Sequence, residues 1–226
     1  QDLQKLIEDG LKAHKKGEFE LANRCYSKVL QKAPDRADAW HLAGVLAHTQ
    51  GHISLALTHI KEALRLESEF PEALNALGNI LKEQRKFDDS LNAYNRAIEI
   101  NDKLAETYAN RGELYRCTGD LKKAEDDCRK SIFLNPQLSV AHGNLAAVLM
   151  DNKDWVSAEL SLREAIRLTP GKHEFLVNLS GTEYGLSDCF NTSLLVSCIF
   201  LQLELFKPVF FTSKICASKK SLNFTL

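Results

Sequence analysis

The 226-residue chain contains none of the short motifs that commonly mark an active site. A G-x-x-x-x-G-K-S/T phosphate loop, a dinucleotide-binding G-x-G-x-x-G, an H-E-x-x-H and a G-x-S-x-G are all missing. These absences argue against the enzyme classes that such motifs mark. We therefore expect neither a catalytic residue nor a cofactor in this chain.

The chain also has no excess of either charge, because its 29 Lys and Arg residues are balanced by 30 Asp and Glu residues, which gives a net charge of −1. No overall field therefore favours nucleic acid or an anionic membrane surface, and we expect no nucleic-acid partner. The six cysteines form no C-x-x-C pair, which argues against a zinc ribbon or a redox motif. We predict that Cys25 and Cys128 are buried free thiols of a reducing compartment, cytoplasmic or nuclear.

Metal ligands are equally scarce. His41 and His48 lie seven residues apart on one predicted helix face, but no series of Cys or carboxylates accompanies them. Zinc needs three or four protein ligands, so we interpret these two as surface or groove histidines. The acidic run from Glu125 to Asp127 is predicted to be a solvated helix face.

What the chain does contain is a period of 34 residues in four columns of side chains. The columns are small, small, large and small: Gly10, Gly44, Gly78, Gly112 and Ala146; Ala22, Ala56, Ser90, Ala124 and Ala158; Tyr26, Ile60, Tyr94, Cys128 and Leu162; Val29, Ala63, Ala97, Ser131 and Ala165. Small residues allow two helices to approach closely, and the large residue fills the gap that they leave. The columns therefore predict a repeated pair of packed helices.

The repeat is clearest over residues 105–138. Tyr108 and Gly112 lie four residues apart, on one face of a first helix. Gly119 ends that helix because glycine tolerates the left-handed conformation, and Pro136 ends the second helix because proline cannot continue the hydrogen-bond ladder. A single helical hairpin of this length cannot bury its apolar face, so it needs copies beside it.

This pattern resembles the tetratricopeptide repeat, whose signature is W-x2-L-G-x2-Y, then A-x3-F, then P. Trp40, Gly44 and Ala56 carry it in one unit, and Gly78 and Tyr94 in the next. The resemblance implies an all-α, right-handed solenoid of antiparallel helix pairs. The expected units are five repeats at 3–36, 37–70, 71–104, 105–138 and 139–172, then the first helix of an incomplete sixth at 173–184 and a non-repeat apolar tail at 185–226.

The tail departs from the repeat abruptly. Gly181 and Gly185 interrupt the sixth unit, and only seven charged residues occur in the 46 residues of 181–226. Three interpretations stay open: sequence unrelated to the fold, which the abrupt change favours, an apolar helix that caps the last repeat, or a membrane anchor. Residues 193–206 are mainly apolar, but a span needs about 20 apolar residues, so a membrane contact is disfavoured.

A row of asparagines recurs with the same period. Asn110, Asn144 and Asn178 are 34 residues apart, and Asn79 is predicted to lie about 60° around the same surface. The tetratricopeptide resemblance implies that first helices line a concave groove, so we expect these side chains to face solvent there. An amide offers both an acceptor and donors, which suits the backbone of an extended peptide. The alternative is that Asn is simply tolerated at an exposed polar position.

The row resembles the asparagine ladder in the repeat arm of O-linked N-acetylglucosamine transferases, with L-G-N at 77–79 and N-L-A-A-V-L at 144–149. Arrays that precede sulfotransferase domains look equally similar. The matching groove places hold no Lys or Arg, so a basic clamp on a C-terminal carboxylate is not indicated.

Two functions follow from these features. The first is a non-enzymatic scaffold that binds a protein or peptide partner in the groove. The second is the truncated, substrate-recruiting arm of a larger transferase, whose catalytic residues are not in this sequence. Because the chain begins with Gln1 and its single Met is Met150, we expect a fragment or a processed chain. The oligomeric state stays open.

Overall fold

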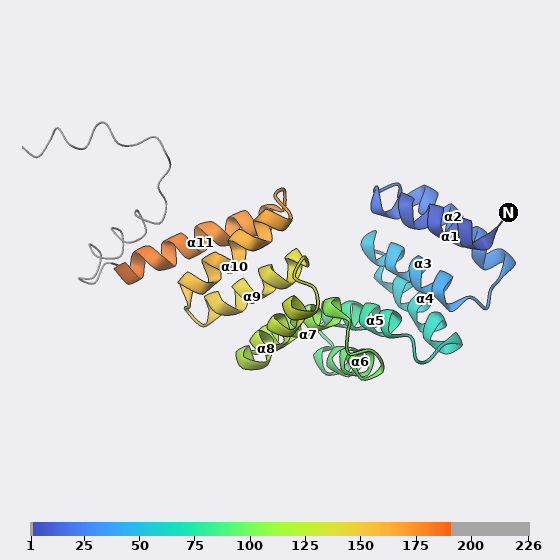
Figure 1. Cartoon of the computed structure of the whole chain (residues 1–226). Helices are drawn as coiled ribbons and strands as arrows, with labels where there is room; N and C mark the ends of the chain where they lie inside the picture. The colour runs from blue at the N-terminus through green and yellow to red at the C-terminus, as the bar shows by residue number, and fades with distance from the viewer. Residues whose placement is uncertain (1, 191–226) are drawn as a thin grey trace, which may run out of the picture. The chain divides into compact units, whose positions relative to one another are not determined.

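A computed structural model describes residues 2–190, which form eleven helices and no strand (Figure 1). The helices are α1 (Leu3–Lys15), α2 (Phe19–Lys32), α3 (Ala37–Thr49), α4 (Ile53–Leu66), α5 (Pro71–Glu83), α6 (Phe87–Ile100), α7 (Ala105–Thr118), α8 (Leu121–Leu134), α9 (Ser139–Asp151), α10 (Trp155–Leu168) and α11 (His173–Phe190). Residues 1–182 form one compact unit, to which all contacts below belong. The predicted all-α solenoid is confirmed.

The helices pack in sequential pairs. Each odd-numbered helix from α1 to α9 contacts the even-numbered helix that follows it, and these are called first and second helices below. A second helix also packs on the next first helix, and consecutive first helices contact one another from α1 to α9. Side chains of the first helices are therefore brought side by side at intervals of one repeat.

The close approach predicted from the small column is present. A Cβ atom added at Gly10 would lie 2.6 Å from Cε1 of Tyr26, and one added at Gly44 would lie 2.7 Å from Cδ1 of Ile60. At Gly78 the ring of Tyr94 occupies the same place. Such distances are shorter than real Cβ contacts, so the glycine column is what allows each first helix to reach its second helix.

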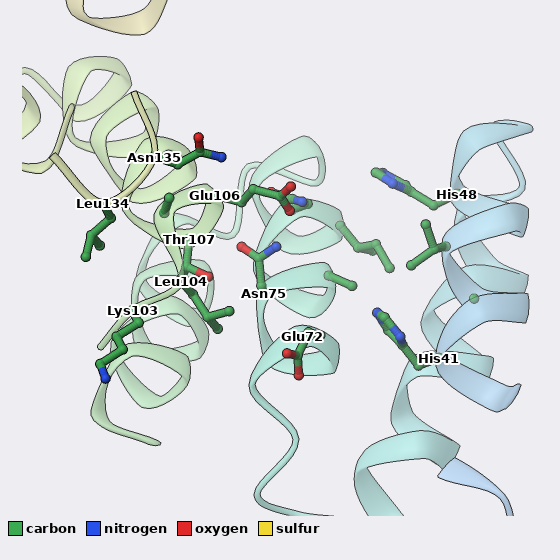
Figure 2. Close-up of a pocket in the computed structure, with 16 residues that line it drawn as sticks. His41, His48, Glu72, Asn75, Lys103, Leu104, Glu106, Thr107, Leu134 and Asn135 are labelled. Atoms are coloured by element: carbon green, nitrogen blue, oxygen red, sulfur yellow. The ribbon is translucent and has the colours of Figure 1, made fainter. Parts of the chain in front are cut away.

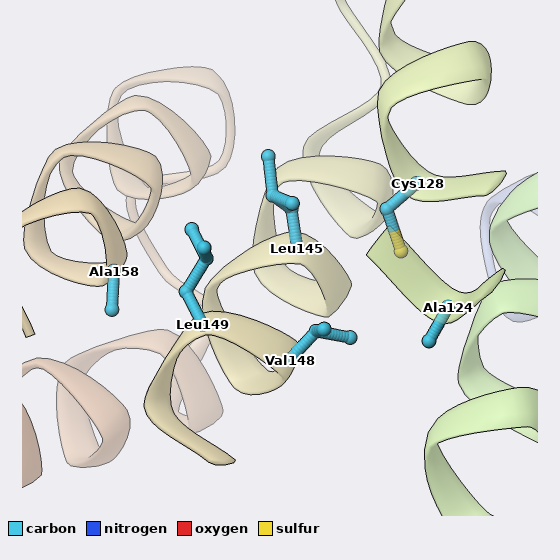
Figure 3. Close-up of a cluster of buried hydrophobic side chains, with 6 residues drawn as sticks. All are labelled: Ala124, Cys128, Leu145, Val148, Leu149 and Ala158. Carbon is cyan, nitrogen blue, oxygen red and sulfur yellow. The ribbon is translucent and has the colours of Figure 1, made fainter. Parts of the chain in front are cut away.

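The fourth pair packs around a thiol. Cys128 and Ala124 of α8 are fully buried against Leu145 and Val148 of α9, in a cluster that Figure 3 shows. Burial raises the pKa of the Cys128 thiol to about 12. Cys25 is buried as well, as predicted, whereas Cys117 is exposed.

A column of left-handed residues joins the two helices of each pair. Gly17, Gly51 and Gly119 have φ values of 78°, 78° and 86°. Arg85 and Lys153 stand at the same place in their units, with φ values of 59° and 62°. The turn geometry is therefore kept in two units whose residue does not favour it.

Two expectations from the sequence are wrong. The helix that was expected to end at 184, interrupted by Gly181 and Gly185, continues to Phe190 as α11. A glycine inside a helix costs only about 1 kcal/mol relative to alanine, which is not enough to end it.

The apolar run at 193–206 lies outside the described residues. Within the part of the chain that is described, no helix is long and apolar enough to cross a membrane.

The second correction concerns the acidic run in α8. Asp127 is buried rather than solvated, with 7% of its surface exposed. Its carboxylate accepts two hydrogen bonds from Arg111, at 2.7 Å from Nε and 2.8 Å from Nη2. Arg111 also donates to Oδ1 of Asn95 at 2.7 Å, so one side chain links α6, α7 and α8. Removing one partner of such a buried pair would leave an uncompensated charge.

Replacing Gly112 with Leu should lower the free energy of unfolding by about 1–3 kcal/mol, because the side chain overfills the contact between α7 and α8. A Cβ atom there would lie 2.9 Å from Sγ of Cys128 and 3.1 Å from the carbonyl oxygen of Ala124. Gly171 has nothing within 4 Å, so Gly171→Leu is the matched control. Urea unfolding followed by circular dichroism measures both. Equal stability of the two variants would contradict the contact.

Replacing Arg85 with Gly should raise the free energy of unfolding by up to about 1.6 kcal/mol. Relief of the left-handed strain is worth about 1–2 kcal/mol, and the added entropy of the unfolded chain removes about 0.4–1 kcal/mol. Lys86 has an ordinary φ of −87°, so Lys86→Gly should instead lower stability. Thermal unfolding of both variants tests the difference, and a loss of stability in Arg85→Gly would refute it.

Candidate functional site

A cavity on the first helices has a volume of about 670 Å³. It lies between α3, α5, the start of α7 and the end of α8, and is called the α3–α5–α7 cavity below (Figure 2). Its polar lining includes His41, His48, Glu72, Asn75, Asn79 and Glu106. Figure 2 shows His41 and His48 on one side of the cavity and Glu106 and Thr107 on the other, with Asn75 between them. This volume is sufficient for a peptide side chain or a small ligand.

The two histidines are groove residues, as predicted. The ring of His41 lies edge-on to Phe70, with 5.0 Å between the ring centroids. Burial lowers the pKa of His41, although the carboxylates of Glu72 and Asp38 oppose this shift. The neutral ring therefore predominates at pH 7. Nε2 of His48 lies 2.9 Å from Oε1 of Glu83, on the next first helix.

A smaller cavity has a volume of about 260 Å³ and lies between α7, α9 and α11. Asn144 and Asn178 line this α7–α9–α11 cavity. Two basic residues, Arg116 and Lys172, line it as well, so the groove is not without cations. Each is paired with a carboxylate, Arg116 with Asp151 at 3.0 Å and Lys172 with Glu174 at 3.2 Å.

The four predicted asparagines do not share one site. Asn79 lines the α3–α5–α7 cavity, Asn144 and Asn178 line the α7–α9–α11 cavity, and Asn110 lines neither. All four side chains are half-buried, so the expectation of freely solvated amides is wrong. The reason is that the first helices lie close enough for an amide on one to reach the next.

Three of these amides already make a hydrogen bond within the chain. Nδ2 of Asn110 donates to Oδ1 of Asn75 at 3.0 Å, and Nδ2 of Asn144 donates to the carbonyl oxygen of Ala109 at 3.0 Å. Both bonds join consecutive first helices. Oδ1 of Asn79 accepts from the hydroxyl of Tyr94 at 2.7 Å. Asn178 makes no hydrogen bond with a described residue, so its whole amide is available in the smaller cavity.

Asn75 is one of the groove places that the sequence predicts, but the predicted peptide-binding row does not include it. It lines the α3–α5–α7 cavity and accepts the hydrogen bond from Asn110. Its position 34 residues after His41 and four before Asn79 was the available signal, because those three places share one face of the first helices.

A second series of polar links joins the ends of the first helices. One partner of each link recurs every 34 residues, and the other lies on the next first helix: His14 with Thr49, His48 with Glu83, Lys82 with Glu113, and Arg116 with Asp151. The Nε2–Oγ1 distance in the first pair is 3.4 Å, and the Nη1–Oδ2 distance in the last is 3.0 Å. These inter-unit links hold neighbouring first helices in register along the groove.

The large core column contains two tyrosines, and only one of them makes a hydrogen bond with a groove residue. The hydroxyl of Tyr94 donates a hydrogen bond to Asn79, but the hydroxyl of Tyr26 is buried without a partner among the described residues. Leu11 stands in the first unit where Asn79 stands in the third. Burial raises the pKa of Tyr26 to about 12, and it raises that of Tyr94 as well.

The two tyrosines should respond in opposite ways to the same substitution. Tyr94→Phe should lower the free energy of unfolding by about 0.5–1.5 kcal/mol, because the bond to Asn79 is lost. Tyr26→Phe should leave it unchanged or raise it, because an unpaired buried hydroxyl is removed. Urea unfolding midpoints of the two variants decide the matter. Similar losses in both would contradict the assigned hydrogen bonds.

Comparisons with known proteins agree with this geometry. Two family models described as Tetratricopeptide repeat match residues 10–69 and 105–138, and one described as TPR repeat matches residues 78–119. Tetratricopeptide repeat protein 13 of Homo sapiens is 28% identical over 130 residues, which is 55% of this chain and 15% of that protein. The UDP-N-acetylglucosamine–peptide N-acetylglucosaminyltransferase of Giardia intestinalis is 31% identical over 118 residues, or 52% of this chain and 8% of that protein.

The chain thus spans only a small part of either relative. Among solved structures, a thermophilic TPR protein of Thermus thermophilus, TTC0263, has a TM-score of 0.72 at 16% identity, and the match covers 81% of this chain and 100% of that one. This likeness shows the fold. Together the three family models cover more than half of the residues, and the chain belongs to the tetratricopeptide repeat family.

Proposed function

We propose that this chain is an interaction scaffold that binds an extended peptide segment of a partner protein across its first helices. Tetratricopeptide arrays serve as protein-interaction modules, and the groove cavities give this array a place for the peptide. The observation that carries the proposal is the set of amides in the two cavities, Asn75, Asn79, Asn144 and Asn178.

These amides retain hydrogen-bonding capacity. An Asn side chain offers two N–H donors and an acceptor oxygen with two lone pairs. Asn144 uses one donor within the chain, Asn79 uses part of its acceptor, and Asn178 uses neither. Each can therefore bond a peptide N–H or C=O whatever the peptide's side chains are.

The spacing of the amides also suits an extended chain. Asn144 of α9 and Asn178 of α11 lie at the same place in consecutive units, and α11 packs on α9 through Phe175, whose ring occupies the space beside Gly143. Packed helices are about 8–10 Å apart, and three residues of extended chain span about 10 Å. A peptide laid across the first helices would thus present an equivalent backbone group to successive units at every third residue.

The described residues supply little chemistry for catalysis. No three His, Cys, Asp or Glu side chains between residues 2 and 182 lie close enough to hold a metal ion. The buried Cys128 is protonated at neutral pH, because its pKa is raised to about 12. A protonated thiol is a poor nucleophile, since the thiolate is the reactive form.

Asn178 and Asn110 allow binding to be separated from stability. Asn178→Ala should weaken a peptide bound over the α7–α9–α11 cavity by about 0.5–1.5 kcal/mol, or roughly two- to tenfold, and leave the unfolding midpoint unchanged. Asn110→Ala should lower the unfolding free energy by about 0.5–1.5 kcal/mol, because it loses the bond to Asn75. Fluorescence anisotropy with a pool of ten-residue peptides and urea unfolding measure the two effects.

Two outer-face variants serve as controls for that experiment. Asp126 and Lys130 are exposed residues of α8 that line neither cavity, so Asp126→Ala and Lys130→Ala should leave peptide binding unchanged. If Asn178→Ala binds the pool as tightly as the unmodified protein, the amides are only a polar surface and the proposed binding mode is refuted.

A second proposal is that the chain is the substrate-recruiting arm of a larger transferase. The Giardia glycosyltransferase, which resembles this chain at 31% identity, supports it. The likeness covers 8% of that protein, so it extends to the repeats alone. The gene's reading frame beyond residue 226 tests this proposal, since it requires a sugar-nucleotide or sulfonucleotide domain there.

A further inference from the structure

We propose that the α3–α5–α7 cavity selects peptide segments that carry a basic side chain, Arg or Lys, and that Glu72 and Glu106 hold this side chain. The inference rests on the proposed function, because it names the kind of peptide that the groove accepts. It begins from a difference in how the carboxylates along the first helices are paired.

Most carboxylates along this face already have a polar or charged partner on a neighbouring residue. Glu83 lies against His48, Glu113 against Lys82, Asp151 against Arg116, and Glu174 against Lys172. Glu72 and Glu106 differ, because neither forms a hydrogen bond or an ion pair with any described residue. The two stand 34 residues apart, at the second position of α5 and α7, and both line the α3–α5–α7 cavity.

A helix N-terminus favours a carboxylate, and this accounts for a glutamate in the first turn of α5 and α7. It does not account for the lack of a partner. Glu174 has the same second position in α11, yet it is paired with Lys172. Glutamates without a hydrogen bond or an ion pair are therefore particular to the cavity between α3, α5 and α7, although the carboxylate of Glu72 acts through space on the ring of His41.

The rest of the lining suits a cation and its backbone. Lys103 is the one Lys or Arg among the sixteen lining residues, and Figure 2 shows its side chain directed away from Glu106. His41 adds no net positive charge at pH 7, because burial lowers its pKa. Asn75 lies between the two glutamates in the view of Figure 2, where its amide can hold the backbone beside the basic side chain.

The size of the expected preference is modest. Glu72 and Glu106 are exposed, and an exposed ion pair is screened by water and salt. Each carboxylate should therefore favour a basic over an isosteric neutral side chain by roughly two- to fivefold. The two together should give a preference of roughly four- to twenty-five-fold if their effects add.

Three labelled pools of ten-residue peptides test the inference. All pools are random in Ala, Gly, Ser and Thr except for one central residue, which is Arg, Gln or Glu. Fluorescence anisotropy at low salt should rank the pools Arg, then Gln, then Glu in affinity for the unmodified protein. In the double variant Glu72→Gln with Glu106→Gln, the Arg pool should bind no better than the Gln pool, and far-ultraviolet circular dichroism should be unchanged.

Glu99→Gln is a control for the removal of charge elsewhere, to be compared with Glu72→Gln alone, since it removes one exposed carboxylate of α6 that lines neither cavity. It should keep the Arg preference. Equal binding of the Arg and Gln pools to the unmodified protein would overturn the basic preference and leave the proposed peptide binding standing. Failure of all three pools to bind would overturn both. Equal loss of the Arg preference in Glu99→Gln would show an effect of net charge and would also overturn the inference.

Discussion

The array depends on one contact, in which a large side chain of each second helix packs against a small residue of its first helix. In the third unit the ring of Tyr94 fills the space beside Gly78 that a side chain would otherwise occupy. The hydroxyl of Tyr94 donates a hydrogen bond to Asn79, which lies on the groove side of α5, the helix that contains Gly78. The core contact thus reaches the groove, and a change in helix separation would move the amide as well.

Much of the fold could be predicted from the sequence because the packing repeats. The columns headed by Gly10 and Tyr26 report contacts that recur at a fixed interval, so chance agreement is excluded by repetition. The end of α11 was mispredicted because a single glycine shifts helix stability by only about 1 kcal/mol. Tertiary contacts, such as that of Phe175 with Gly143, also stabilise α11, but a local sequence pattern does not reveal them.

The candidate site was predictable in composition and less so in geometry. The period placed Asn144 and Asn178 on corresponding positions, and they do line one cavity. It did not show that Asn110 would turn to Asn75 instead, since this depends on the distance between two helices that are far apart in sequence. The burial of Asp127 was missed for the same reason: its partner, Arg111, lies on the other helix of the pair.

The inter-unit links have a consequence for how the chain acquires its structure. The side-chain bonds that join consecutive first helices, including those of His48 with Glu83 and of Arg116 with Asp151, each span 35 residues or fewer. Loop closure over such short stretches has a small entropic cost, and topologies with local contacts fold quickly. A unit has these partners as soon as the next first helix has been synthesised. Folding can therefore follow translation from one end of the array to the other, without waiting for distant segments.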